Sequence, residues 1–396
     1  MKPLGGREVS MVEMVEKFRT AIADELPAAT TLRHRLHADP RVSGDEADTA
    51  DDVVRALDAG PAAHVAGTGR VLRIGGDGPA VVLRAELDAL PIVERTGAPY
   101  ASRTSAMHAC GHDVHLAALV AVCRAAARIG VETPISALLQ PREESAPSGA
   151  ADVVREGVLD GAIAVIGAHV QPRLPQCVVS AAPGPVNAAA DEFEITIEGR
   201  GGHAGYPHTA RDPVLALCQS VVSLQQIVSR RFDPVHGAVC SVGQVRAGSA
   251  PNVIPRTASA RGTVRVMGDA DRPVMARLLQ EIVEHTASAH GCIGRVTVEE
   301  VEPPLINDPP LAAQAARRLG GMGIPVDTVF RSFGADDFSY YGEVTRSLML
   351  FVGTASTAAP DAPGLHDSRF LPGDFLIGRV AEAYLAGYLA ACDTHV

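Results

Sequence analysis

Apolar residues recur at two different spacings along the first half of the chain. Spacings of three and four residues, typical of amphipathic helices, cover residues 11–39, 46–60 and 115–130. Short apolar runs bounded by glycine or proline predict strands at residues 69–75, 79–87, 134–141 and 162–170. The first two of these strands follow each other closely, so we expect them to pair as a hairpin or as neighbours. Helices that alternate with short apolar strands predict an α/β sheet covered by helices on both faces.

The pattern changes near residue 184, where proline and glycine cluster. The next strand, residues 192–199, alternates apolar with polar residues, as an antiparallel strand with one solvated side does. Helix, strand, strand, helix and strand are then predicted at residues 212–232, 237–248, 258–267, 272–291 and 295–301. This is the element order of a ferredoxin-like α+β sandwich. We therefore predict a domain of residues 185–302 inserted into an α/β domain formed by residues 1–184 and 303–396.

Composition narrows the class of protein. The net charge of −11, without any basic run, argues against nucleic acid and anionic membranes as partners. We find no segment of about 18 uninterrupted apolar residues and no apolar secretion signal at the N-terminus. The seven cysteines are scattered along the chain and odd in number, so no disulfide framework is predicted. We expect a soluble cytoplasmic protein.

The stretch MHACGHDVH, residues 107–115, concentrates residue types that bind metals. Cys110 and His112 stand just before a predicted helix, and Gly111 between them permits a tight backbone that turns both inward. Thiolate and imidazole together suit a borderline transition metal. His108 and His115 flank His112, and we expect them to support the site from a second layer or to serve the structure.

Further candidate ligands follow other predicted strands. Glu143 and Glu144 come after residues 134–141, His169 ends residues 162–170, and His366 lies in a loop after the apolar run SLMLFVG. One of two adjacent carboxylates can bind a metal while the other transfers protons. Each residue alone has an ordinary structural explanation, but open α/β sheets place their sites at strand ends. Together with Cys110 and His112, these loops supply enough ligands for two metal ions that share a bridging water.

Other polar residues are candidates for roles around this site. Asp88 follows the strand at residues 79–87 and can orient a ligand imidazole, and Glu86 points the same way if the strand persists. His203, framed by glycines in GRGGHAGYPH, can reach a substrate or simply form a turn. Asn252 and Arg265 belong to the inserted domain, and a guanidinium can hold a carboxylate through two hydrogen bonds.

These motifs carry a family resemblance. The chain contains, in this order, RAELDALP, TGAPYAS, MHACGHDVH, QPREE, GAHV, GGHAGYPH, DPV, PNVIP, GTVR, DDFSYY and PGLHDSRF. It resembles the dinuclear aminoacylase/carboxypeptidase metallopeptidase family over nearly its whole length. Within that family it looks most like the amidohydrolase branch, which includes hippurate hydrolases, indoleacetyl-amino-acid hydrolases and N-acyl-amino-acid deacylases. The resemblance implies that two divalent ions, Zn²⁺ or Mn²⁺ with Co²⁺ or Ni²⁺ as alternatives, are bound by Cys110, His112, Glu144, His169 and His366.

The resemblance also implies a reaction. Glu143 would be the general base, which takes a proton from a metal-bridging water and returns it to the leaving amine. From its position after the strand, we also count Asp88 among the catalytic residues. The inserted domain would be a lid that forms a homodimer, and its His203 would stabilise the oxyanion in the partner's active site. Asn252 and Arg265 match positions that hold the substrate carboxylate. The expected function is hydrolysis of N-acyl amino acids to a carboxylic acid and a free amino acid.

Departures from the family pattern and three alternative functions stay open. Glu86 stands where the branch has aspartate, EESAPSGA replaces a more glycine-rich run, and a glycine common two residues before His108 is missing. All the ligands remain, so we expect an unusual acyl pocket beside an intact metal site. The scaffold would also suit a dipeptidase or an N-carbamoyl-amino-acid hydrolase. A binding homologue without turnover is a third alternative, against which Glu143 and Asp88 argue.

Overall fold

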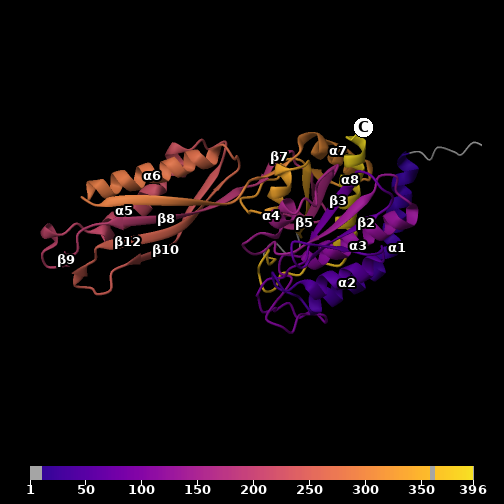
Figure 1. Ribbon diagram of the computed structural model, residues 1–396, viewed down its shortest axis with the longest axis horizontal. Coiled ribbons are helices and arrows are strands. Elements are labelled where there is room, and N and C mark those ends of the chain that lie inside the picture. Colours follow the sequence, from indigo (N-terminus) through magenta and orange to yellow (C-terminus); the bar gives the residue numbers. More distant parts are fainter. Residues whose placement is uncertain (1–10, 357–361, 396) are drawn as a thin grey trace, which may run out of the picture. The chain divides into compact units, whose positions relative to one another are not determined.

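The computed structural model describes residues 11–356 and 362–395 (Figure 1). The chain forms two compact units, each with its own hydrophobic core. Unit 1 consists of Met1–Gly184, Ile306–Phe330 and Tyr340–Val396, and unit 2 consists of Pro185–Leu305 and Arg331–Ser339. The chain passes into unit 2 through β7 (Gly184–Asn187) and out of it through β14 (Leu305–Asn307).

Unit 1 is built on an eight-stranded mixed sheet in the order β1-β2-β4-β3-β5-β16-β6-β15. Its strands are β1 Ala63–Val65, β2 Gly69–Ile74, β3 Val81–Glu86, β4 Ile135–Gln140, β5 Ala164–Pro175, β6 Val179–Ser180, β15 Val326–Asp327 and β16 Ser347–Ala355. The central strands β4, β3, β5 and β16 are parallel to one another. Their carboxyl ends therefore meet at one edge of the sheet, where open α/β sheets carry their sites.

Helices cover this sheet. The helices of unit 1 are α1 Met11–Ala38, α2 Ala47–Leu57, α3 His112–Ile129, α4 Gly149–Arg155, α7 Pro309–Gly321 and α8 Phe375–Asp393, and η3, Asp337–Glu343, leads back into it from unit 2. α3 and α8 pack on each other and on β3, and α1 packs on α3. α8 is long and apolar enough to cross a membrane, but 72% of its most apolar stretch is buried, as in a core helix.

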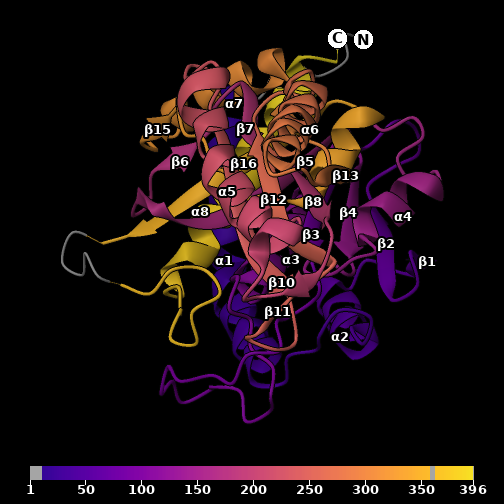
Figure 2. The ribbon, with the colours of Figure 1, turned by 90° about the vertical axis from the view of Figure 1, so that its left-hand side faces the viewer.

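Unit 2 contains a four-stranded antiparallel sheet in the order β10-β12-β8-β13. Its strands are β8 Ala189–Glu198, β10 Ala238–Ala247, β12 Thr257–Val266 and β13 Ile293–Glu302. Its helices are α5 Pro213–Leu224 and α6 Asp271–Ala289, with the short helices η1 Pro207–Thr209 and η2 Ile227–Arg231. α5 and α6 lie side by side against the sheet (Figures 1 and 2). The small strands β9, Gly202–His203, and β11, Val253–Ile254, form a separate pair.

The prediction of a mixed α/β protein with a large sheet and covering helices is confirmed. The predicted pairing of residues 69–75 with residues 79–87 is wrong, because β4 lies between β2 and β3, antiparallel to one and parallel to the other. The loop between β2 and β3 resembles a hairpin turn locally. It is nevertheless long enough to cross two strand spacings of about 4.8 Å each, which leaves room for a strand from later in the chain.

Candidate metal centre

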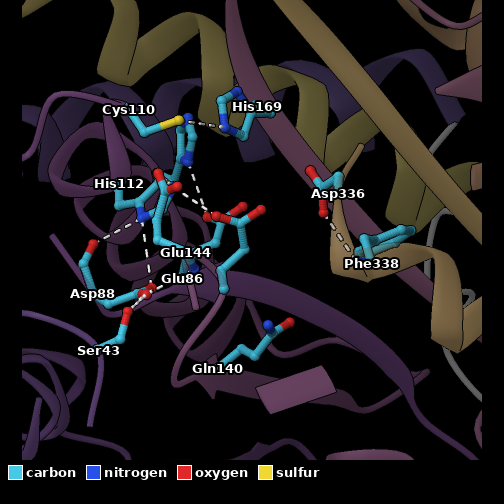
Figure 3. Close-up of polar contacts among 12 residues, drawn as sticks. Ser43, Glu86, Asp88, Cys110, His112, Gln140, Glu144, His169, Asp336 and Phe338 are labelled. Carbon is cyan, nitrogen blue, oxygen red and sulfur yellow. Dashed lines mark hydrogen bonds and ion pairs between the residues drawn. The ribbon is translucent and has the colours of Figure 1, made fainter. Parts of the chain in front are cut away.

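The predicted metal ligands gather at the carboxyl ends of the central strands of unit 1 (Figure 3). Within each of the following overlapping groups, ligand atoms lie within 4.8 Å of one another: Cys110, Glu144 and His366; His112, Glu143 and Glu144; Glu86, His112, His115 and His169. Segments that are far apart in the sequence therefore converge on one small volume.

Gly111 makes the start of α3 fit against β5. Its φ of +84° lies in the left-handed region, and a Cβ atom there would lie 2.5 Å from Cγ2 of Val170. Only glycine combines this backbone conformation with so close an approach. As a result, Sγ of Cys110 lies 3.5 Å from Nε2 of His169.

Hydrogen bonds set the orientation of the candidate ligand histidines. Nδ1 of His112 donates to the main-chain oxygen of Asp88 at 2.8 Å, and Nδ1 of His169 donates to that of Val170 at 2.7 Å. With the proton on Nδ1, each ring presents the lone pair of Nε2 to the site. Nε2 of His112 is buried and has no hydrogen-bond partner among the described residues.

The position of His169 corrects one expectation. It lies inside β5, which continues to Pro175, and not at the strand's end as predicted. Pairing of β5 with β3 stops at Gly167, whereas pairing with β16 continues beyond His169. His169 is therefore past the end of β3, where its side chain can face Cys110. The sequence pattern could not show that β16 pairs with β5 farther along its length than β3 does.

The carboxylates approach the same volume from the turn after β4. Oε2 of Glu143 and Oε1 of Glu144 lie 3.7 Å and 4.0 Å from Nε2 of His112. Oε1 of Glu144 also lies 3.3 Å from Nε2 of His366. Burial opposes ionisation of Glu144, but His366 and His112 outweigh it and lower the pKa of this carboxyl group.

His366 enters from the loop after β16. Its φ is +64°, and its main-chain N–H donates to the oxygen of Ala109 at 2.9 Å. This bond ties the His366 loop to the segment that carries Cys110. The side chain is about half exposed, so it forms the open side of the site.

The donor set fits divalent cations. Burial raises the pKa of the Cys110 thiol well above its usual range, and the carboxylates of Glu144 and Glu143 raise it further. Nε2 of His112 and Oδ1 of Asp88 are buried and have no hydrogen-bond partner among the described residues. A cation offsets such negative charge and favours the thiolate. Thiolate, imidazole and carboxylate together are ligands for first-row transition metals and zinc.

Asp88 and Glu86 do not have similar contacts, although they are two residues apart. Oδ2 of Asp88 accepts from Oγ of Ser43 at 2.6 Å and from the amide of Glu144 at 2.9 Å, and Oδ1 lies 3.8 Å from Nδ1 of His112. Glu86 instead pairs with Arg84 and accepts from Nδ1 of His115. Asp88 thus contacts two predicted ligands, whereas Glu86 holds a histidine behind them.

His115 and His108 differ in their hydrogen bonding. Nδ1 of His115 donates to Glu86 at 2.9 Å, and its Nε2 accepts from the amide of Val170 at 2.9 Å, so both nitrogens are engaged. His115 therefore supports the strand next to His169. Burial lowers the pKa of His108 to about 3, and neither of its ring nitrogens has a hydrogen-bond partner among the residues described.

In unit 2, His203 and Asn252 lie together and Arg265 lies apart. His203 is opposite Val253 in the β9-β11 pair, and the main-chain oxygen of Asn252 accepts from the amide of Ala204 at 3.1 Å. Both side chains are exposed. β9, which carries His203, lies at the tip of unit 2 (Figure 1). Arg265 lies near the other end of β12, about 26 Å of strand from Thr257. A small substrate cannot span that distance.

Sequence reasoning missed residues behind the site, above all Ser43 and Glu46. Ser43 binds Asp88, and Glu46 binds the amide of Arg142 at 2.9 Å. Both stand in a polar stretch before α2 that has the composition of an ordinary helix start. The one feature of the sequence that could have pointed to Ser43 and Glu46 was the polar loop before α2.

Comparison with known proteins identifies the family. Residues 82–386 match the family described as Peptidase family M20/M25/M40. N-acetyl-L-cysteine deacetylase of Bacillus subtilis (strain 168) is 36% identical over 338 residues, which cover 82% of this chain and 79% of that protein. N-acetyldiaminopimelate deacetylase of Shouchella clausii (strain KSM-K16) is 33% identical over 316 residues, with 78% and 82% covered.

A solved structure agrees. The crystal structure of the YXEP protein of Bacillus subtilis, described as a dinuclear metal binding peptidase from the M20 family, matches with a TM-score of 0.82 and 28% identity. The match covers 94% of this chain and 100% of that chain. The predicted family is thereby confirmed, and the chain belongs to peptidase family M20/M25/M40, in its dinuclear amidohydrolase branch.

Proposed function

We propose that this protein is a metal-dependent amidohydrolase that cleaves N-acyl amino acids into a carboxylic acid and a free amino acid. The observation that carries the proposal is the convergence of thiol, imidazole and carboxylate groups at the carboxyl edge of the sheet in unit 1. The relatives named as deacetylases of N-acetylcysteine and N-acetyldiaminopimelate support the substrate class.

Two divalent ions, Zn²⁺ or Mn²⁺ with Co²⁺ or Ni²⁺ as alternatives, would be held by Cys110, His112, Glu144, His169 and His366. Such ions, when bound, polarise a carbonyl and lower the pKa of water. The geometry of the chain's own groups fits this assignment, because His112 and His169 present Nε2 and keep their protons on Nδ1. Asp88 accepts a hydrogen bond from the amide of Glu144 and so holds this candidate ligand in place.

Glu143 is our candidate for the general base. Its side chain is 10% exposed and lies beside His112 and Glu144, so it can be reached by water and substrate. In this role Glu143 takes a proton from the attacking water and then delivers it to the amine that leaves. A carboxyl group within hydrogen-bond reach of the attacking water and of the leaving amine can serve first as base and then as acid.

We also propose that residues 185–302 form a lid and dimerisation domain of a cytoplasmic homodimer. Arg265 would hold the α-carboxylate of the substrate, while His203 of the partner subunit stabilises the oxyanion and Asn252 of the partner subunit assists in substrate binding. The long separation of Arg265 from His203 along unit 2 supports this arrangement. Within one chain the two side chains cannot meet on one small molecule, whereas two chains can supply one each.

Release of free amino acid from a substrate panel tests the function. The panel contains N-acetyl, N-benzoyl, N-carbamoyl and long-chain N-acyl amino acids and dipeptides, and the protein is analysed for metal and supplied with Zn²⁺ or Mn²⁺. We expect metal-dependent release from N-acyl amino acids. Release from dipeptides or N-carbamoyl amino acids alone would favour those alternative functions, and no release with two metals bound would contradict hydrolysis.

A mixing experiment tests the role of the partner subunit. His203→Ala and Glu143→Ala chains should each be inactive, but mixed dimers should regain activity, because one of their sites receives an intact His203 and an intact Glu143. Mixed His203→Ala and Arg265→Ala chains serve as a second pair. Failure of mixed dimers to regain any activity would contradict the proposed action of His203 across the dimer.

A further inference from the structure

The segment that precedes α2 is fixed beside the metal centre. Val42 forms a parallel bridge with Ala89, and the amide of Ala89 donates to the main-chain oxygen of Arg41 at 2.7 Å. These bonds hold the segment next to the turn that follows β3. Its side chains are therefore within reach of the residues behind the site.

Glu46, at the end of this segment, is completely buried. Its Oε1 accepts from the amide of Arg142 at 2.9 Å, and its Oε2 accepts from Oγ1 of Thr68 at 2.7 Å. A buried carboxylate is retained only where hydrogen bonds compensate the loss of water. Both oxygens of Glu46 have such a bond, and one of them reaches the turn that carries Glu143.

Capping of α2 does not explain Glu46. It occupies the N-cap position of α2, yet its side chain makes no capping hydrogen bond to that helix. The side chain instead reaches a backbone amide that is 96 residues away in sequence. Its contacts point to a role in the turn after β4.

That turn has an unusual backbone. Arg142 adopts a φ of +53°, in the left-handed region that non-glycine residues rarely occupy. Such a conformation persists only where its surroundings enforce it. Glu46 binds the amide of Arg142, and Asp88 binds the amide of Glu144 at 2.9 Å. Buried carboxylates thus hold the residues on both sides of Glu143.

We propose that Glu46 is a positioning residue that fixes the direction of Glu143 and Glu144 by holding the amide of Arg142. The inference rests on the proposed function, in which Glu143 is the general base and Glu144 a metal ligand. Ser43 helps to fix the same turn, because its hydroxyl donates to Asp88 at 2.6 Å and Asp88 in turn binds the amide of Glu144. Glu46 touches neither substrate nor metal and acts only through the turn.

Three variants separate positioning from simple packing. Glu46→Ala removes the acceptor, and Glu46→Asp keeps the charge but shortens the reach. Both should lower kcat by about 100-fold with KM nearly unchanged, since a displacement of about 1 Å costs this much. Glu46→Gln keeps an oxygen that can accept from Arg142 and should retain most of the wild-type kcat. Tyr388→Phe, which removes the bond from the Tyr388 hydroxyl to the oxygen of Thr133, is the control for loss of a remote partly buried hydrogen bond.

The second measurement is the absorption spectrum of each protein after titration of the metal-free form with Co²⁺. Glu46→Ala and Glu46→Asp should shift the bands or weaken Co²⁺ binding, because Glu144 moves, whereas Glu46→Gln and Tyr388→Phe should match the wild type. Wild-type kcat and an unchanged Co²⁺ spectrum in Glu46→Asp would overturn the proposal. Wild-type protein that is inactive on the whole panel would defeat the proposed function, but the Co²⁺ spectra would still decide the role of Glu46.

Discussion

Two neighbouring residues at the start of α3 face very different surroundings. His112 looks into a volume where thiol and carboxylate groups gather and where its own Nε2 has no hydrogen-bond partner in the described structure. Asp113, one residue later, is equally buried but is paired with Arg33 and His37 at 2.9 Å each. Beside Asp113 the protein places a buried guanidinium as counter-charge, whereas beside Nε2 of His112 it gathers carboxylates. The difference teaches that burial of charge alone does not mark a functional site, whereas the convergence of several metal-ligating groups does.

Removal of metal should have the largest effect, which is loss of turnover. It should act at the candidate metal site around His112 and leave the pairing of Asp113 intact. We expect a chelator to abolish turnover, and Zn²⁺ or Mn²⁺ to restore it. Metal at 100 times its Kd should also stabilise the fold by about 2.7 kcal/mol, because it binds the native state. Activity assays and thermal melts of metal-free and reloaded protein measure both. Full activity in protein shown to be metal-free would break the comparison.

Substitution of Asp113 should have the next largest effect, on stability. Asp113→Ala leaves Arg33 without its fully buried counter-charge, and loss of one partner of a buried pair costs about 3–5 kcal/mol. Urea unfolding of metal-free protein measures this change. Arg35→Ala, in the helix α1 that also carries Arg33, is the control, because the exposed pair of Arg35 with Asp52 is worth about 0–1 kcal/mol. Equal losses in the two variants would contradict the assigned role of Asp113.

The smallest predicted effect is a pH dependence on the Asp113 side. Burial opposes protonation of His37, but Asp113 and Glu94 outweigh it and raise its pKa above its usual value of 6.5. The stabilisation is therefore complete below pH 6.5 and is lost as the pH rises through the folded-state pKa. Relative to His37→Gln, the wild type should lose stability as the pH rises above 6.5 and through the folded-state pKa, by about 1.4 kcal/mol per unit of pKa shift.

Urea midpoints of the wild type and His37→Gln across this pH range test that prediction. His64→Gln, which replaces an exposed histidine on β1, controls for the loss of a histidine as such. If the stability difference between wild type and His37→Gln does not change with pH, His37 is not protonated in the native state.

Local patterns predicted much of the fold and of the candidate site. The helices α1, α2 and α3 and the strands β3, β4 and β5 follow from apolar spacing, because each buries one face or is buried on both. Cys110 and His112 stand out because cysteine and histidine rarely cluster without a reason. Their convergence with Glu144 and His366 followed from the rule that parallel strands end at one edge.

The rest depends on contacts that spacing does not encode. The insertion of β4 between β2 and β3 is a long-range pairing, and the loop between those strands has no feature that requires it. Glu46 looks like the start of a helix, and only its bond to the amide of Arg142 reveals its relation to the site. β5 continues past His169 because it pairs with β16 there. The sequence around His169 therefore suggested a strand end that the structure does not have.

The central claim is that Glu143 performs proton transfer at a metal centre that other residues hold. Glu143→Gln, which keeps the size of the side chain but removes the base, is the most direct test. The measurement is metal content together with turnover of the best N-acyl amino acid in the panel. We predict two bound metal ions, as in the wild type, with kcat lower by about 10²–10⁴-fold. A variant that keeps both metals and a near wild-type kcat would contradict the account.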